Sequence, residues 1–296
     1  MGDMTGGSGT MATWLPEVWS MKPTITYRSN LVAVPLLDHT WEPEIGVGRG
    51  DTVNIPGFAQ NNAARNRGAG TGTFGTGAGI TFDAVSESQT QLIVNRFYYK
   101  AFRQPVEAAE QAMPSYTPLL IGGQGQAIAL QVDADIFADG SDGFDTFSTI
   151  VGTDNVDITD DDLIELETNL NNNNAPVNDR FLAISPASRG SLLKIEAIRN
   201  SLYAGTIGNI AGSMGPGFLG PVLTFQVHMT NNLEAGTSGT KNFGWQREAV
   251  AFAEQISVRT ERDLNIEDGV FMQYISFQTC GFKVIKSNFA NELAGK

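Results

Sequence analysis

The sequence GDTVNIP at residues 50–56, followed by QLIVNRFYYKAF at residues 91–102, decides the fold of this chain. The first segment alternates polar and apolar residues, as a half-covered strand does, and the second is rich in β-branched and aromatic residues. Together they predict the two strands of one long hairpin. An isolated two-stranded hairpin is at best marginally stable in water, so we expect a neighbouring molecule to order this one.

The insert between these strands has almost nothing to bury. It combines NNAARNR at residues 61–67 with a glycine series at residues 68–79, and its one large apolar residue is Phe74. We therefore predict that the hairpin tip contacts an adjacent subunit through Arg65, Arg67 and Phe74. The segment from Gly70 to Gly75 matches a dinucleotide-binding pattern, but no helix follows it, so a flexible tip is the favoured interpretation.

Composition limits the possible functions. The 296 residues carry a net charge of −13 and the 19 basic residues are scattered, which argues against direct binding of phosphate backbones. One cysteine, Cys280, allows no internal disulfide and fits a reducing compartment. No signal peptide is recognisable, and the longest early apolar run, residues 31–37, is far too short to span a bilayer. The composition indicates an acidic globular protein compatible with the cytoplasm.

Two tryptophans mark the N-terminal region. Trp14 and Trp19 follow a start rich in Gly, Ser, Thr and Met that has no periodicity. Exposed tryptophans are costly unless a groove receives them, so either an adjacent subunit or their own domain must cover them. We predict that they contact an adjacent subunit.

Two helices are predicted after the hairpin. Residues 124–138 lack proline, are apolar on most sides and are followed by Gly140, which indicates a long, largely buried helix. Thr159 and the three acids after it predict a capping box at the start of a second helix. The buried stripe of that second helix is then Leu163, Leu166 and Leu170.

Shorter elements fill the rest of the chain. Residues 180–184 read as a compact strand, and Ser185-Pro186 as the start of a helix that continues through Ile198. Residues 223–229 alternate as a strand with one wet face, which carries His228. Further strands are predicted at 247–254 and 256–259, and a terminal hairpin pairs 270–279 with 282–286 around Cys280-Gly281.

No set of residues predicts catalysis or a metal site. His39, His228 and Cys280 are not spaced for nucleophilic catalysis or for zinc. Five aspartates are dense enough to suggest calcium, but no glutamate closes a calcium loop at its twelfth position, so a solvated acidic helix end is favoured. These aspartates are Asp133, Asp135, Asp139, Asp142 and Asp145. We expect no catalytic residue, cofactor or metal.

Taken in order, these segments resemble the major capsid proteins of tailed bacteriophages, which share the Hong Kong 97 fold. Residues 50–56 look like the opening strand of the family's extended E-loop, and residues 91–102 look like its return into the peripheral domain. Residues 124–138 resemble the C-terminal part of the spine helix, although Gly122-Gly123 and Gly125 predict a late start or a bend. Residues 179–186 resemble the strand and Ser-Pro element of the axial domain. Residues 247–253 resemble the segment that re-enters the peripheral domain, and residues 280–285 resemble the closing strand.

The resemblance implies an α+β, Hong Kong 97-type capsid fold with an N-terminal arm, an extended β-hairpin (the E-loop), a peripheral domain with a long spine helix, and an axial domain. The arm would be residues 1–46, the E-loop 47–99, the peripheral domain 100–153 and 246–296, and the axial domain 154–245.

The resemblance also implies a function. The chain would be a major capsid protein, not an enzyme, that self-assembles into pentamers and hexamers of an icosahedral shell around phage genomic double-stranded DNA. It would be part of a virion assembled in the host cytoplasm. Its partners would be copies of itself, a separate scaffolding protein, a portal and a cementing or decoration protein. It would contact no membrane and bind DNA without sequence specificity.

Two alternatives stay open at this point. An encapsulin-like cellular nanocompartment shares the fold but encloses enzyme cargo, and its N-terminus resembles this chain less. A nucleotide-dependent enzyme is suggested only by the glycines from Gly70 to Gly75.

The sequence also predicts how the shell is held together. Some relatives join an E-loop lysine to an asparagine of a neighbour, but no lysine lies between Lys22 and Lys100. An arginine guanidinium stays protonated and cannot replace the attacking amine. We therefore expect a shell without covalent cross-links. The short segment before the hairpin leaves no room for a large scaffold domain, so we expect a separate scaffolding protein.

Overall fold

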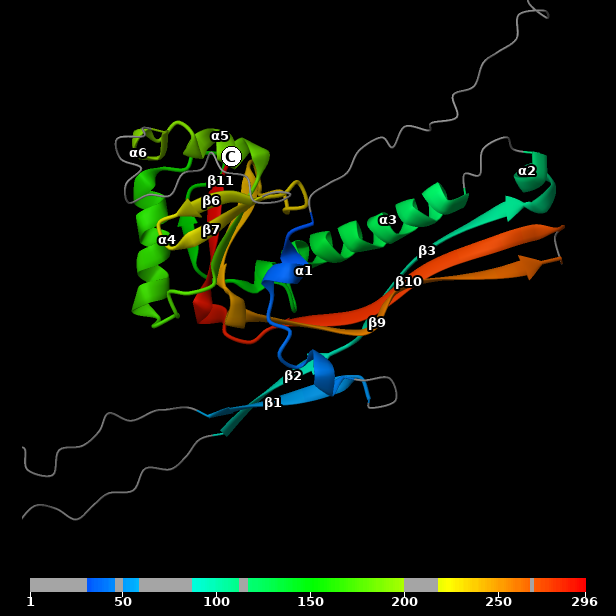
Figure 1. Ribbon diagram of the computed structural model, residues 1–296. Helices are drawn as coiled ribbons and strands as arrows, with labels where there is room; N and C mark the ends of the chain where they lie inside the picture. Colours follow the sequence, from blue (N-terminus) through cyan, green and yellow to red (C-terminus); the bar gives the residue numbers. More distant parts are fainter. Residues whose placement is uncertain (1–30, 46–49, 59–86, 112–116, 200–217, 267–268) are drawn as a thin grey trace, which may run out of the picture.

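The computed structural model describes residues 31–45, 50–58, 87–111, 117–199, 218–266 and 269–296. These segments form three sheets and the helices that pack on them, so the predicted α+β class is confirmed. A six-stranded sheet lies at one end of the molecule, a long three-stranded sheet extends away from it, and a two-stranded hairpin lies beside the three-stranded sheet (Figure 1).

The six-stranded sheet has the strand order β4-β11-β8-β5-β7-β6. Neighbours β4 and β11 are parallel, as are β5 and β7, whereas the other pairs are antiparallel. Segments far apart in the sequence therefore meet in one sheet. Its strands are β4 (Ile150–Gly152), β5 (Arg180–Ile184), β6 (Phe218–Val222), β7 (Phe225–Met229), β8 (Thr240–Gln246) and β11 (Ala290–Gly295).

Helix α4 (Asp160–Asn172) packs on this sheet and begins at the predicted capping box. Thr159 Oγ1 accepts a hydrogen bond from the backbone N–H of Asp162, and the Asp162 carboxylate accepts one from the N–H of Thr159. Gly244 leaves room for the helix, because a Cβ there would lie 2.8 Å from a methyl carbon of Leu166. The predicted buried stripe is confirmed at Leu163, Leu166 and Leu170.

The strand at residues 180–184 is confirmed as β5, and the helix start after it is confirmed at Ser185. Ser185 Oγ accepts a hydrogen bond from the N–H of Ser188 at 3.0 Å, which caps α5 (Pro186–Leu192). A single helix through Ile198 is wrong. The N–H groups of Lys194 and Ile195 bond three residues back, so the chain tightens and turns before α6 (Glu196–Arg199).

The three-stranded sheet has the order β3-β10-β9 and is antiparallel throughout. Its strands are β3 (Arg96–Pro105), β9 (Val250–Asn265) and β10 (Phe271–Val284). The predicted terminal hairpin around Cys280-Gly281 is wrong, because β10 runs through both residues without turning. The two strands predicted between residues 247 and 259 are one strand, β9, preceded by a short 3-10 helix, η4 (Arg247–Ala249).

Helix α3 (Thr117–Ala138) lies along one face of this sheet (Figure 1). It starts earlier than predicted, and Gly122, Gly123 and Gly125 lie inside it. The sheet holds this glycine-rich half in place, because the Gln124 side chain donates to the carbonyl oxygen of Lys100 and accepts from the Ser276 hydroxyl. Tertiary contacts thus outweigh the low helix propensity of glycine.

The hairpin consists of β1 (Thr52–Phe58) and β2 (Glu87–Ile93), paired antiparallel. The single strand predicted at residues 91–102 is two strands, because the chain leaves the ladder at Val94-Asn95 to pass from the hairpin into β3. Ile55, Leu92 and Val94 pack with Ala251 and Ala253 of β9. The base of the hairpin is therefore anchored in its own subunit, while residues 59–86 lie outside the described residues.

Gly281 allows this anchoring. A Cβ at Gly281 would lie 2.2 Å from the carbonyl oxygen of Ile93 and 2.8 Å from Val94 Cα, both of them backbone atoms. Glycine at this position serves the close approach of two chain segments, and not a turn.

We expect Gly281→Ala to lower the free energy of unfolding by ~1–3 kcal/mol, because the backbone of the hairpin base must move away. Urea unfolding and hydrogen exchange at the Val94 amide, which donates to Asp51, measure this effect. Gly123→Ala is the matched control, because nothing lies within 4 Å of its added Cβ. Equal stability of the two variants would contradict the close approach.

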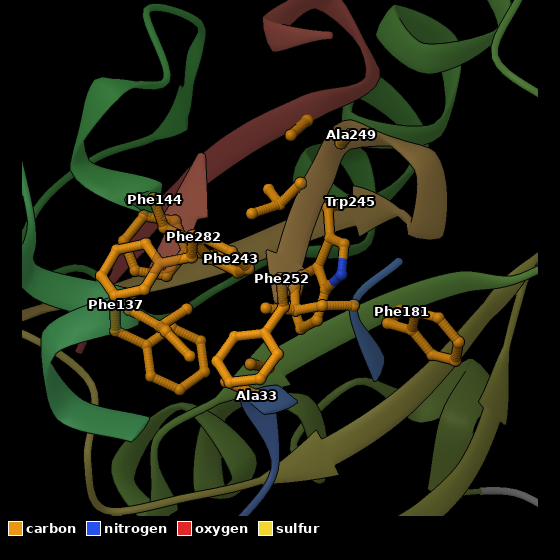
Figure 2. Packing of buried hydrophobic residues seen from close by; sticks show 14 of the residues in the cluster. Ala33, Phe137, Phe144, Phe181, Phe243, Trp245, Ala249, Phe252 and Phe282 are labelled. Atoms are coloured by element: carbon orange, nitrogen blue, oxygen red, sulfur yellow. The ribbon is translucent and has the colours of Figure 1, made fainter. Parts of the chain in front are cut away.

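One aromatic core joins the six-stranded and the three-stranded sheets (Figure 2). The Phe144 ring lies 4.8 Å from that of Trp245 and 5.2 Å from that of Phe137, between centroids.

The core residues Ala33 and Leu37 show that part of the predicted N-terminal arm packs on its own subunit. The predicted domain boundaries stay a prediction. The remaining elements are α1 (Ala33–Leu36), η2 (Glu42–Glu44), α2 (Val106–Gln111), η3 (Phe144–Thr146) and η5 (Ser287–Phe289).

Candidate assembly surfaces

The predicted contact residues Trp14, Trp19, Arg65, Arg67 and Phe74 lie outside the described residues. They stay predictions.

The face of the three-stranded sheet opposite α3 carries exposed aromatic side chains. On β3, the Tyr98 hydroxyl donates to Asp135 of α3 at 2.7 Å, which places Tyr98 on the helix side. Because side chains alternate along a strand, Phe97 and Tyr99 point to the other side. They are 57% and 65% exposed, although aromatic side chains of this size are usually covered.

Two neighbouring side chains pack beside these rings, and one of them, Phe277, is largely buried. The Phe97 ring lies 5.7 Å from that of Phe277 and 6.1 Å from that of Tyr99, measured between centroids. The guanidinium of Arg259 lies over the Phe277 ring at 4.7 Å, an attractive cation–π contact. We call Phe97, Tyr99, Phe277 and Arg259 the aromatic face.

The aromatic face is not among the sequence-based predictions, because residues 91–102 predict only a strand that returns from the hairpin. The alternation along residues 97–99 does show that Phe97 and Tyr99 lie on one side of the strand and Tyr98 on the other. Without the register of β10, however, the sequence does not say which of the alternating positions α3 covers.

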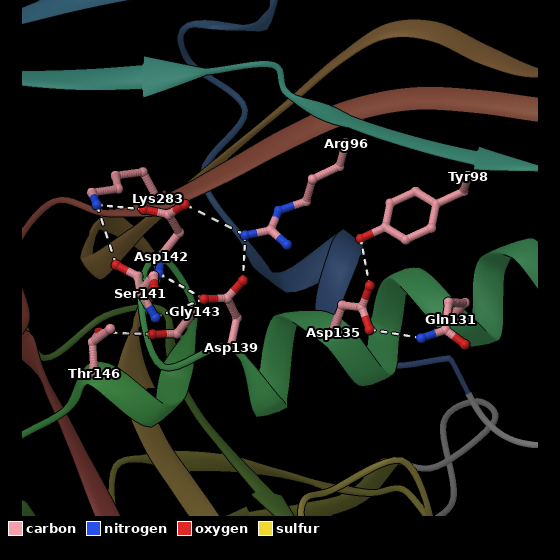
Figure 3. Close-up of polar contacts among 10 residues, drawn as sticks. All are labelled: Arg96, Tyr98, Gln131, Asp135, Asp139, Ser141, Asp142, Gly143, Thr146 and Lys283. Atoms are coloured by element: carbon pink, nitrogen blue, oxygen red, sulfur yellow. Dashed lines mark hydrogen bonds and ion pairs between the residues drawn. The ribbon is translucent and has the colours of Figure 1, made fainter.

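The acidic end of α3 is held by cations and is not simply solvated (Figure 3). Arg96 of β3 pairs with Asp139 and Asp142, and Lys283 of β10 pairs with Asp142. Burial disfavours the charge on Asp139, but hydrogen bonds from the backbone N–H groups of Asp142 and Ser141 and from Arg96 hold its pKa below the usual value. The favoured solvated interpretation is therefore wrong for Asp139 and Asp142, and also for Asp133, which is buried.

Asp133 anchors the N-terminal segment. Its side chain is 1% exposed and accepts hydrogen bonds from the N–H groups of Val32 and Ala33 and from the Asn232 amide, at 3.1, 2.6 and 2.8 Å. Burial raises the pKa of Asp133, and these three donors oppose that effect. The contact connects α3 to the start of α1 and to the segment after β7.

The histidines and the cysteine have structural surroundings. The predicted alternation is confirmed at buried Phe225 and Val227 and exposed Gln226, whereas His228 is half-buried and burial lowers its pKa to about 4. Cys280 is fully buried, and burial raises the pKa of its thiol to about 12, which keeps it unreactive at neutral pH. His39 bonds Glu42 at 2.8 Å and the carbonyl oxygen of Val34 at 2.9 Å.

Within the described ranges, no group of three or more His, Cys, Asp or Glu side chains is arranged to hold a metal ion. None of the helices described there is both long and apolar enough to cross a membrane.

Comparisons with known proteins give matches at the level of structure. No protein-family model matches the chain, and no curated protein sequence matches it. A solved structure from Mycobacterium phage Che8 has a TM-score of 0.73 and 20% sequence identity, covering 95% of this chain and 97% of that one. The capsid structure of cyanophage P-SCSP1u has a TM-score of 0.71 and 15% identity, covering 98% and 95%.

A third structure, the capsid of Myoviridae phage XM1, covers 98% of this chain and all of that one, with a TM-score of 0.66 and 14% identity. The likeness thus extends over nearly the whole chain in each case. The chain has the Hong Kong 97-type capsid fold.

Proposed function

We propose that this chain is the major capsid protein of a tailed double-stranded-DNA bacteriophage, with a structural and not an enzymatic role. The observation that carries the proposal is the near-full-length likeness to phage capsid structures, at 95–98% coverage of this chain. Copies of the chain would assemble into pentamers and hexamers of an icosahedral shell in the virion.

The described surface supports self-association. Two large aromatic side chains stand exposed on a regular sheet, where burial against another subunit would stabilise the contact by about 2 kcal/mol for each ring. The net charge of −13 suits a shell whose inner wall should not adhere to packaged DNA. Under the same proposal, a separate scaffolding protein, a portal and a cementing protein are the further partners.

Electron microscopy of the purified, expressed protein tests the proposal. We expect regular icosahedral shells, or capsomers that close into shells when the scaffolding protein is supplied. A monodisperse monomer under both conditions would contradict it. Shells that carry a folded enzyme as cargo, and no DNA, would favour an encapsulin-like nanocompartment instead.

The absence of a lysine between Lys22 and Lys100 predicts a shell without covalent cross-links. Mature particles boiled in detergent are expected to give a single band near 31.8 kDa on a denaturing gel. A ladder of multimers would contradict this prediction, and particles of a cross-linking relative run beside them provide the positive control.

A further inference from the structure

The outer strand of the three-stranded sheet, β9, has an open edge (Figure 1). One side of β9 pairs with β10, and on the other side Asp38 bonds Val250 and Phe252 at the start of the strand. No described strand covers the edge from residue 257 to residue 264, and every side chain there is exposed. An uncovered edge of this length offers its N–H and C=O groups to another strand.

The backbone of Leu264 shows which of these groups point outward. Its N–H donates to the carboxylate of Asp263 at 2.8 Å, which places it on the outer edge and not toward β10. In an antiparallel strand, the N–H and C=O groups of alternate residues point to the same side. Those of Val258, Thr260 and Arg262 therefore point away from β10, where a further strand can bond them.

The sequence of this edge is complementary to itself when two copies run antiparallel with Glu261 at the centre. In that register Arg259 lies opposite Asp263 of the second copy. Val258 lies opposite Leu264 of the second copy, and these side chains, 42% and 49% exposed, would cover each other. Opposite charges and apolar side chains placed directly across two strands stabilise their pairing. By symmetry each of these pairs occurs twice.

Neighbouring registers lack this complementarity. With Thr260 at the centre, Val258 would face Arg262 of the second copy, and the apolar pair would be lost. With Arg262 at the centre, Glu261 would face Asp263, which is a pair of like charges. Charged side chains on an edge strand commonly prevent pairing, and here they would discourage these shifted registers.

Two further features of the subunit suit the register centred on Glu261. The two Glu261 side chains would meet at the centre, but each has a cation beside it, because Arg259 of the same strand lies 3.2 Å away. Helix α3 does not obstruct the edge, because its Gln124 bonds Lys100 of β3 and Ser276 of β10 and the helix therefore lies over those two strands.

We propose that two copies of this chain pair antiparallel through residues 258–264 of β9, about a twofold axis at Glu261. The two three-stranded sheets would then form one continuous sheet. The paired segment ends before the part of the β9 edge that Asp38 occupies, so the N-terminal segment of each subunit can stay in place. This contact rests on the proposed self-assembly and names one interface within it.

Glu261→Cys tests the position of the axis. Residues opposite each other in a non-hydrogen-bonded antiparallel pair lie ~4.5 Å apart between Cα atoms, which a disulfide can span. Mild oxidation of the subunits or particles should therefore give a disulfide-linked dimer on a non-reducing gel. The native Cys280 is buried, so the unaltered chain should give none.

Thr260→Cys is the matched control for the register. The two copies of residue 260 would be diagonal neighbours, ~7–8 Å apart, which is beyond the reach of a disulfide. We expect no dimer from this variant. A dimer from Thr260→Cys and none from Glu261→Cys would overturn the proposal.

Charge reversal tests whether the edge meets a second copy of itself. In the Glu261→Cys background, Arg259→Asp or Asp263→Arg alone places like charges opposite each other, so the cross-linked dimer should be lost. Mixing the two reversed subunits restores both opposite-charge pairs, and the dimer should return. Circular dichroism checks that each variant is folded. Loss in both variants without recovery on mixing would mean that another segment occupies the edge, and the proposal would be wrong.

These results are distinguishable from a failure of the proposed function. Shells in which Glu261→Cys gives no dimer would refute the β9 contact and support the capsid role. Cross-linked dimers that never form shells would support the β9 contact and count against the capsid role.

Discussion

Replacing Phe97 and Tyr99 together with serine is expected to abolish shell formation while the subunit stays folded. In the isolated subunit these rings are 57% and 65% exposed, so their removal takes little apolar area out of its interior. In the assembly each ring would be withdrawn from water, which is worth about 2 kcal/mol. Under the proposed function every subunit would repeat the contact, so the loss would multiply over the shell.

Sedimentation velocity and electron microscopy measure assembly, and circular dichroism with urea unfolding measures folding of the subunit. Lys100→Ser on the same strand is the matched control, because Lys100 is exposed but lies outside the aromatic face. Normal shells from the double variant would show that the aromatic face is not a subunit interface. An unfolded double variant would show that its role lies within the subunit.

Local signals in the sequence predicted several elements correctly. The capping box at Thr159 and the leucine stripe of α4 depend on residues three or four positions apart, and so does the cap at Ser185. A short, compact apolar run was enough to predict β5 at residues 180–184, where every side chain is buried. In each case the interacting residues lie within a few positions of one another in the sequence.

The failures have a different cause, which is contact between distant segments. The sequence predicts a turn at Cys280-Gly281, but glycine is needed at 281 because the backbone of Ile93 and Val94, almost two hundred residues earlier, lies against it. The glycines of α3 predict a late start or a bend, yet the Gln124 side chain bonds that half of the helix to β3 and β10. Composition alone cannot separate a glycine that breaks an element from one that lets another segment approach.

The candidate site was the least predictable part. Asp139 and Asp142 are close in sequence and follow α3. Their partners Arg96 and Lys283 lie far away in the sequence, on β3 and β10. An acidic cluster therefore looks like a solvated linker until the strands are placed. The aromatic face is hard to predict for the same reason, since its residues are distant in sequence. Phe277 lies next to Phe97 only because of the register of β10 against β3.

Phe144→Ala is expected to give the largest loss of stability among single substitutions in the aromatic core, ~3–5 kcal/mol. The side chain is fully buried, and its ring contacts those of Phe137, Phe147, Phe243 and Trp245 at 4.8–5.4 Å between centroids. A residual cavity there would separate α3 from β8. Such a loss is a large fraction of the ~5–15 kcal/mol that stabilises a typical domain.

The core also predicts how the variant unfolds. Since Phe144 connects the end of α3 with the six-stranded sheet, both parts should lose structure in one transition that moves to lower urea concentration. Tryptophan fluorescence, which includes the buried Trp245, and far-ultraviolet circular dichroism should report the same midpoint. Phe97→Ala, a ring of the same size on the exposed aromatic face, is the control and should cost about 1 kcal/mol or less. Two separate transitions in Phe144→Ala would show that the six-stranded and three-stranded sheets have independent cores, in which case the contacts of Phe144 would not be what joins them.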